Sequence, residues 1–287
     1  MERKLIARGI VCGALAGLLA FVFARIFAEP QISKAIDYES GRDAAQALLD
    51  KAAGLTPDAA GPDLFSRSVQ ANIGIGVGVI AFGAAMGALF AVVYAIGLGR
   101  VGRLQPRSLA LLVAAGGFLG FYLAPFVKYP ANPPSIGHED TIKQRGGSYL
   151  LMVAASIVLL VAAVWLGQRL AARFGNWNAS LLAGAAFVVV IGCVMALLPT
   201  YHETPAPLTD PQGGIAYPGF PADVLFRFRF YSVAAQVVLW GALGLMYAPL
   251  AERLLAPIQE RSFSTQSAQV PPSGIRQKRQ QLLRTNP

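Results

Sequence analysis

The chain has 287 residues, of which 55% are hydrophobic and 14% charged, with a formal net charge of +9. A soluble globular domain carries about 25% charged residues, so this composition excludes an ordinary soluble fold and predicts a membrane domain in contact with the lipid bilayer. The positive charge does not indicate nucleic acid as a partner, because the sequence has no aromatic-basic motif and basic residues in membrane proteins follow topology.

Six segments are long and apolar enough to cross a bilayer core of about 30 Å, which needs about 20 residues of helix. In chain order they are 7–27, 72–98, 108–127, 149–167, 179–198 and 231–250. We predict an all-α, polytopic transmembrane bundle of about six spans, within a domain of residues 1–257. A basic start before the first span also fits a signal peptide, but its apolar run is longer than a signal core, which favours a retained helix.

The basic residues divide between the two sides of this bundle. Fourteen of the 24 Lys and Arg residues lie at the N-terminus, in the short loops after the second and fourth spans, and in the tail. Twelve of the 15 acidic residues lie in the three long connections on the opposite side. Cytoplasmic loops keep the excess of Lys and Arg, so we expect cytoplasmic termini in a multi-pass protein of the bacterial inner membrane.

The connections on the two sides also differ in character. The long ones cover residues 28–71, 128–148 and 199–230, and the first of them contains a segment, 33–54, that is suited to a surface helix. Residues 258–287 are rich in Gln, Ser and Arg without an apolar period. Such a composition predicts a disordered, basic cytoplasmic tail.

Glycines recur within the spans at a spacing of four residues. Faces of this kind let helix backbones approach closely in lipid, where packing drives helix association. We therefore expect helix packing at Gly13, Gly17, Gly74, Gly78, Gly83, Gly87, Gly116 and Gly120. The glycine run at 74–78 also has the form of a nucleotide-binding fingerprint, but no strand precedes it, so the packing interpretation is favoured.

Several classes of chemistry leave no signature in the sequence. It contains no phosphate-binding Gly-Lys-Ser/Thr loop, no His-Glu-x-x-His motif and no Gly-x-Ser-x-Gly elbow, so we expect no enzymatic activity. The two cysteines, Cys12 and Cys193, lie inside apolar segments and are interpreted as small buried hydrophobes. The middles of the spans contain no Asp, Glu, Lys, Arg or His, which argues against a self-contained proton-driven transporter.

Polar residues at the outer ends of the spans are the candidates for binding. Imidazole and carboxylate groups bind first-row divalent metals such as Co²⁺. Five residues on one face carry these groups: His138, His202, Glu203, Glu29 and Asp140. Alternatively the histidines are ordinary loop residues and Glu203 pairs with Arg227 or Arg229. We expect loop bracing from Lys128, Asn132, Asp223, Arg227 and Arg229.

These outer motifs also carry a family resemblance. The relevant segments are Phe-Ala-Glu-Pro at 27–30, residues 128–134, Gly-Asn-Trp-Asn-Ala at 175–179, Leu198-Pro199 with Glu203, and residues 220–229. Together they resemble the CbtA family of probable cobalt-transporter subunits, from the first helix to about Leu255. Residues 206–219 look like an insertion relative to that family, which is often described with five spans where we count six.

The resemblance implies one component of a Co²⁺ uptake system that supplies cobalamin synthesis, acting with a second, small protein that has one span and carries histidines. Co²⁺ would be a substrate, with no permanently bound cofactor. Two alternatives stay open at this point. One is a transporter of another solute, such as an anion held by the outer arginines, and the other is a membrane scaffold or assembly protein whose glycine faces bind partner helices.

Overall fold

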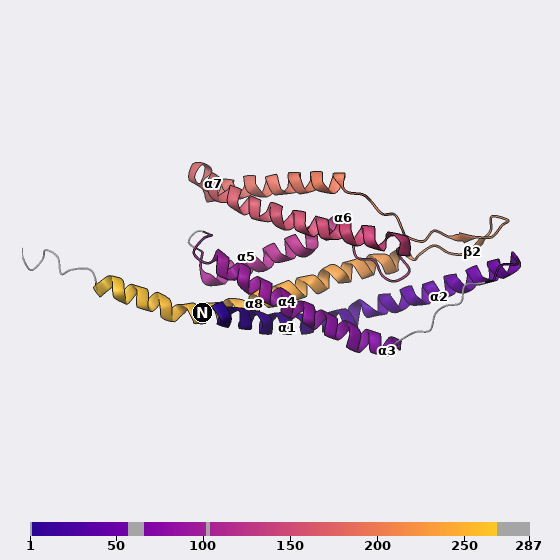
Figure 1. Ribbon diagram of the computed structural model, residues 1–287, viewed down its shortest axis with the longest axis horizontal. Coiled ribbons are helices and arrows are strands. Elements are labelled where there is room, and N and C mark those ends of the chain that lie inside the picture. The colour runs from indigo at the N-terminus through magenta and orange to yellow at the C-terminus, as the bar shows by residue number, and fades with distance from the viewer. Residues whose placement is uncertain (1, 57–65, 102–103, 269–287) are drawn as a thin grey trace, which may run out of the picture.

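The computed structural model describes residues 2–56, 66–101 and 104–268 as an elongated bundle of helices (Figure 1). The elements are α1 (Glu2–Phe27), α2 (Glu29–Ala52), α3 (Arg67–Val69), η1 (Gln70–Gly74), α4 (Ile75–Gly97), α5 (Pro106–Gly117), η2 (Phe118–Leu123), α6 (Ala124–Lys128), η3 (Glu139–Thr141), α7 (Ile142–Leu197), β1 (Leu208–Thr209), β2 (Ile215–Tyr217) and α8 (Ala222–Ala268).

Among the described residues, five helices are long and apolar enough to cross a membrane: 2–27, 67–97, 106–128, 142–197 and 222–254. The predicted all-α membrane bundle is therefore confirmed. The fourth of these, α7, has 56 residues but breaks at Gly175, where φ is 75° and ψ is 164°. Its two arms fold back on one another (Figure 1), so the predicted spans 149–167 and 179–198 are the arms of one helical hairpin.

The turn of the α7 hairpin depends on glycine. The backbone angles of Gly175 lie in a region that is essentially restricted to glycine, because a Cβ would clash there. Near the turn the arms pack closely, since a Cβ added at Gly167 would lie 3.4 Å from the Cβ of Ala183. Side chains of both arms, including Met152 and Phe187, then form a small apolar core with Ala124 of α6.

The bundle has two distinct ends (Figure 1). The start of α1, the α4–α5 connection and the Gly175 turn lie at one end, which we call the terminal end. Helix α2, the segment 129–138 and the β1–β2 hairpin lie at the other, which we call the loop end. The basic loops expected in the cytoplasm fall at the terminal end. Of their residues, Arg103 and those beyond Ala268 lie outside the described part of the chain.

Helices α1 and α4 approach to backbone contact. A Cβ added at Gly13 would collide with the carbonyl oxygen of Gly83, and one at Gly87 would collide with that of Gly9. A Cβ at Gly17 would lie 2.7 Å from the carbonyl oxygen of Val79. Only hydrogen fits at these positions, so the spacing of four residues places one glycine face of α1 directly against another on α4.

The other glycine pairs behave differently. Gly74 and Gly78 make no such contact within the described part of the chain, because a Cβ at Gly78 would meet no atom within 4 Å and one at Gly74 would meet only the Val69 carbonyl oxygen, at 3.8 Å; their role in packing stays a prediction. With 3.6 residues per turn, Gly76 shares the face of Gly83, and Gly78 points away from it. Gly116 and Gly120 lie against α7, since an added Cβ would be 3.5 and 3.4 Å from the Leu160 side chain of that helix.

The main core lies between α1, α4, α5 and α8. Tyr247 of α8 is fully buried and packs edge-on against Phe90 and Tyr94 of α4. The third span then widens into the π-helical turn η2. The buried Ser156 hydroxyl of α7 donates a hydrogen bond to the carbonyl oxygen of Gly120 in that turn, so a π-turn carbonyl that lies inside the bundle is satisfied by a side chain.

The loop end is organised by α2. This helix follows α1 after Ala28, so the surface helix predicted at 33–54 is part of a longer one. Tyr38 packs with Ile136, Phe220 and Val224, joining α2 to the 129–138 segment and the start of α8. The Tyr38 hydroxyl also donates to the Pro218 carbonyl oxygen at 3.0 Å.

The segment that looked like an insertion, residues 206–219, forms a two-stranded antiparallel hairpin. Its turn is set by Asp210, whose carboxylate accepts hydrogen bonds from the backbone of Gln212 and Gly214 at 3.0 and 2.7 Å. At the other end of the chain, α8 runs to Ala268. The domain boundary expected at 257 therefore falls inside a helix, and 269–287 of the predicted tail lie outside the described residues.

Candidate functional site

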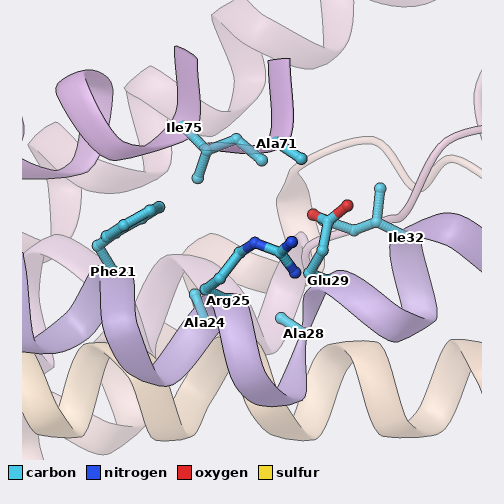
Figure 2. A pocket seen from close by; sticks show the side chains of 8 residues that line it. All are labelled: Phe21, Ala24, Arg25, Ala28, Glu29, Ile32, Ala71 and Ile75. Atoms are coloured by element: carbon cyan, nitrogen blue, oxygen red, sulfur yellow. The ribbon is translucent and has the colours of Figure 1, made fainter. Parts of the chain in front are cut away.

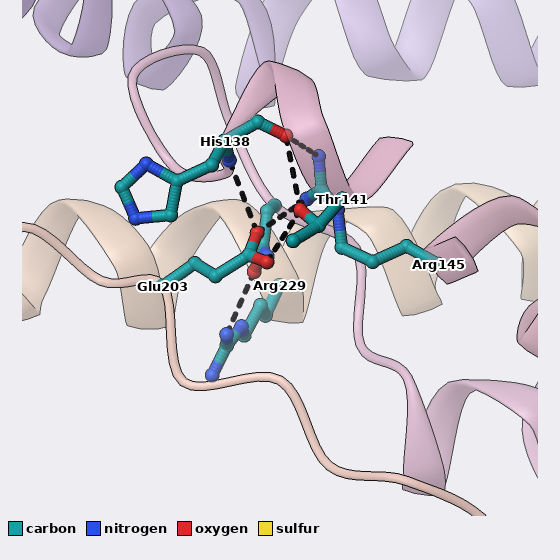
Figure 3. A network of polar contacts seen from close by, with 6 residues as sticks. His138, Thr141, Arg145, Glu203 and Arg229 are labelled. Carbon is teal, nitrogen blue, oxygen red and sulfur yellow. Dashed lines mark hydrogen bonds and ion pairs between the residues drawn. The ribbon is translucent and has the colours of Figure 1, made fainter. Parts of the chain in front are cut away.

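The densest polar network at the loop end is built around Glu203, in the segment after α7 (Figure 3). Its carboxylate accepts a hydrogen bond from the Thr141 hydroxyl at 2.6 Å and one from the backbone N–H of His138 at 3.2 Å. Arg145, in the first turn of α7, forms an ion pair with it at 3.1 Å. The Glu203 carboxylate therefore joins the segment before the α7 hairpin to the segment after it, as the contact of Tyr129 with the Pro199 carbonyl oxygen does nearby.

Electrostatics keep this carboxylate charged. The hydrogen bond from Thr141 is the largest cause that holds the pKa of Glu203 below its ordinary value of 4.5. Although desolvation opposes the shift, the His138 backbone and the positive charge of Arg145 reinforce it. The alternative pairing of Glu203 with Arg227 or Arg229 is wrong, because the ion-pair partner of Glu203 is Arg145, at the start of α7.

The other predicted metal ligands on these two segments are exposed. His202 is exposed beside Glu203, and Asp140 is exposed in the short η3 turn. The imidazole of His138 points away from the carboxylate of Glu203, although its own backbone donates to that carboxylate (Figure 3). The fold thus brings the segments carrying His138, Asp140, His202 and Glu203 together without placing all four side chains around one point.

Three of the five residues expected to brace the loops make contacts of that kind. Arg229 of α8 donates to the Asn132 side-chain oxygen at 2.7 Å and to the Ala131 carbonyl oxygen at 3.4 Å. The Lys128 ammonium donates to the Thr200 hydroxyl at 2.9 Å. Asp223, in the first turn of α8, and Arg227 are both exposed. Arg229 and Lys128 therefore bind oxygen atoms of neighbouring loop residues, which is the bracing role expected of them.

The fifth predicted ligand, Glu29, lies in a different place. It begins α2 directly after the end of α1, and its buried carboxylate forms an ion pair with Arg67 of α3. It also lines a pocket between α1 and α4 (Figure 2). Within the described part of the chain, no group of three or more His, Cys, Asp or Glu residues is arranged to hold a metal ion. The assignment of these residues as Co²⁺ ligands therefore stays a prediction.

Arg145, Thr141 and Arg67 hold the two carboxylates but were not singled out from the sequence. For the two arginines, the available signal is the presence of nine basic residues in connections that are otherwise acidic; Thr141 has no such signal. Basic residues among many carboxylates are near opposite charges, which favours ion pairs. The sequence does not tell which arginine pairs with which carboxylate, since Arg145 and Glu203 are 58 positions apart.

Comparison with known proteins gives a match to one family. No curated protein and no solved structure matches the chain. The model of one family, described as a probable cobalt transporter subunit (CbtA), matches residues 2–252, which include the first four membrane-competent helices, all but the last two residues of the fifth, and the loop end. Because that match covers most of the sequence, the chain belongs to the CbtA family of probable cobalt transporter subunits.

Proposed function

We propose that this chain is the membrane component through which Co²⁺ is taken up to supply cobalamin synthesis, in concert with a second, small protein that has one span and carries histidines. We call this second protein the one-span partner. The family supports a cobalt transporter subunit, which implies a partner. We place the chain in the bacterial inner membrane with its terminal end in the cytoplasm, because the basic loops gather there. A cysteine placed at Gln212 would then be labelled from outside, and one at Arg100 would not.

The observation that supports capture of Co²⁺ at the loop end is the meeting of two segments at Glu203. His202 lies directly before this carboxylate, and the backbone of His138 contacts it at 3.2 Å. Both an imidazole and a carboxylate are ligands that Co²⁺ accepts. In the proposed site His202 and Glu203 bind the ion, while His138 and Asp140 assist from the adjoining segment. Glu29 is not included, because it lies at another junction with Arg67.

Arg145 sets how the ion would be exchanged. Its guanidinium neutralises the Glu203 carboxylate in the structure, so the incoming cation replaces one positive charge by another. Because the pKa of Glu203 is lowered, the carboxylate needs no deprotonation before it binds metal at neutral pH. In this proposal the ion is released when Arg145 returns to Glu203, and the histidines of the one-span partner receive it.

The proposal is tested by cobalt uptake in cells that lack another importer and that produce the one-span partner. His202→Ala removes one imidazole, and Glu203→Gln removes the charge while keeping the shape. Both variants should lower uptake per inserted molecule most strongly at limiting cobalt, since excess metal compensates for weak binding. Asp43→Asn is the matched control, because Asp43 is an exposed carboxylate on α2 at the same end.

Uptake must be divided by the amount of protein in the membrane, because Glu203→Gln also removes an ion pair that joins two segments. A purely structural role for Glu203 would reduce the inserted protein and leave uptake per molecule at the parent value. If His202→Ala and Glu203→Gln both insert normally and import cobalt like Asp43→Asn at limiting metal, the proposed capture site is wrong.

A further inference from the structure

The turn of the α7 hairpin carries two arginines that have no carboxylate partner. Arg169 and Arg173 lie one turn apart on the first arm, so their side chains share one side of the helix. Both residues are exposed, and among the described residues neither guanidinium donates a hydrogen bond or forms an ion pair. Helix α7 contains no Asp or Glu along its whole length. The hairpin itself therefore supplies no negative charge to these arginines.

Two arginines of the neighbouring α4–α5 region bind protein oxygens instead. Arg100 donates a hydrogen bond to the carbonyl oxygen of Ile96 at 2.8 Å, and Arg107 forms an ion pair with Glu252. This region lies beside the hairpin, because the Gln168 side chain donates to the Arg100 carbonyl oxygen at 3.4 Å. The two arginines of the hairpin therefore differ from these neighbours in having N–H donors that are free for a ligand.

Aromatic rings position the two guanidinium groups near the membrane boundary. The guanidinium of Arg169 lies over the Trp165 ring, 4.8 Å from its centroid, and that of Arg173 lies over the Phe174 ring at 5.3 Å. The apolar run of the first arm ends about 3 and 9 Å before the two arginines along the helix axis. Side chains of a helix lean toward its N-terminus, which here means back toward that apolar run. The N–H groups therefore lie at the level of lipid headgroups.

We propose that the turn of the α7 hairpin binds the headgroup of an anionic phospholipid, whose phosphate oxygens accept hydrogen bonds from Arg169 and Arg173. Arginine suits this ligand because its planar fork of N–H donors matches two phosphate oxygens. The exposed rings of Trp165, Phe174 and Trp177 then contact the glycerol and the first acyl carbons. Phosphatidylcholine carries the same phosphate, but its choline cation is repelled by the two arginines. The site therefore favours phosphatidylglycerol over phosphatidylcholine of identical chains.

The test uses the full-length protein, purified and mixed with equal amounts of phosphatidylglycerol and phosphatidylcholine, and counts retained lipid by native mass spectrometry. The double variant Arg169→Gln/Arg173→Gln should lose the preference for phosphatidylglycerol, by about fivefold for each arginine. The matched control, Arg100→Gln/Arg107→Gln, removes the same charge from arginines that bind protein oxygens and should keep the preference. Equal loss in the two double variants would mean that general surface charge attracts the lipid, and would overturn the proposal.

A variant that changes no charge gives a second, independent measurement. Trp165→Leu removes the ring under Arg169 but keeps an apolar side chain, and should weaken the preference about two- to fivefold. Thermal melting shows whether each variant is folded. An unchanged preference in Trp165→Leu or in Arg169→Gln/Arg173→Gln would overturn the proposal. Displacement of phosphatidylglycerol by an equal concentration of inorganic phosphate would show a site for a free anion and overturn the assignment to a lipid. These measurements need neither cobalt nor the one-span partner, so this proposal and the proposed function can fail separately.

Discussion

The α1–α4 pair and the α7 hairpin are held in place in different ways. In α1 and α4, glycines bring two backbones into direct contact over Gly9, Gly13 and Gly17. In α7 only six of 56 residues are buried, and large apolar side chains such as Val188 and Leu197 are exposed. Lipid accepts exposed apolar side chains as readily as a protein core does, so burial alone does not position a membrane helix. Close backbone approach positions α4, whereas covalent and polar closure at its two ends positions the α7 hairpin.

The largest effect is expected at the glycine contact. In Gly87→Leu the new side chain would meet the backbone of Gly9 and Gly13, which cannot move aside as a flexible side chain does. Overpacking of this kind should destabilise the bundle by about 3 kcal/mol or more, measured as thermal or denaturant unfolding in detergent.

Gly78→Leu is the matched control for Gly87→Leu, because it makes the same change on the same helix where nothing lies within 4 Å. It should unfold like the parent protein or slightly later, since leucine favours a helix more than glycine does. Equal destabilisation of the two variants would show that helix propensity or expression, and not the α1–α4 contact, governs the result.

A smaller effect is expected at the turn of the α7 hairpin. Gly175→Ala forces a residue with a Cβ into backbone angles that are essentially restricted to glycine, at a cost of about 1–3 kcal/mol. Unfolding measurements on the same scale check this value. Gly184→Ala, in the second arm and with open space around it, should be neutral or stabilising. If Gly175→Ala unfolds like the parent protein, the turn relaxes easily and does not position the α7 hairpin.

The Glu203 network closes the opposite end of the same hairpin, and its contribution should depend on pH. The folded-state pKa of Glu203 lies below its ordinary value, so the charged form stabilises the fold at pH values above 4.5. That contribution is lost as the pH falls through the lowered folded-state pKa. Glu203→Gln should therefore melt below the parent at pH 7, with a difference that narrows in acid. A difference independent of pH would indicate that shape, and not charge, is what the network requires.

The smallest effect is expected at the ion pair between Arg107 of α5 and Glu252 of α8, at the terminal end. Their contact is 2.5 Å, but the side chains are 62% and 43% exposed. Ion pairs in water contribute about 0.2–1 kcal/mol. Glu252→Gln should shift unfolding by no more than that, and the shift should disappear in high salt. A larger effect would show that α5 and α8 depend on this pair more than on their apolar contact.

The sequence locates the apolar spans because hydropathy acts over windows of about 20 residues and tolerates local errors. It places their ends less well, since the helices at 142 and 222 begin seven and nine residues before the predicted spans at 149 and 231. The sequence is less informative about which face of a helix contacts a neighbouring helix. Gly78 and Gly87 have similar neighbours in sequence, yet only Gly87 contacts α1, because the face follows from how the helix is rotated. The site shows the same limit. Glu203 was identified, but Arg145 as its partner depends on how two loops meet, which no local pattern encodes.

Joining the α7 arms through one residue has a consequence for biogenesis. Because Gly175 alone separates them, no polar loop exists at the turn that could be exported or retained on its own. The second arm, 176–197, carries no Lys, Arg, Asp or Glu that would fix its orientation. Its direction in the bilayer is therefore set by the first arm, whose basic residues Arg169 and Arg173 directly precede the turn. We therefore expect the two arms to enter the bilayer together, as one hairpin.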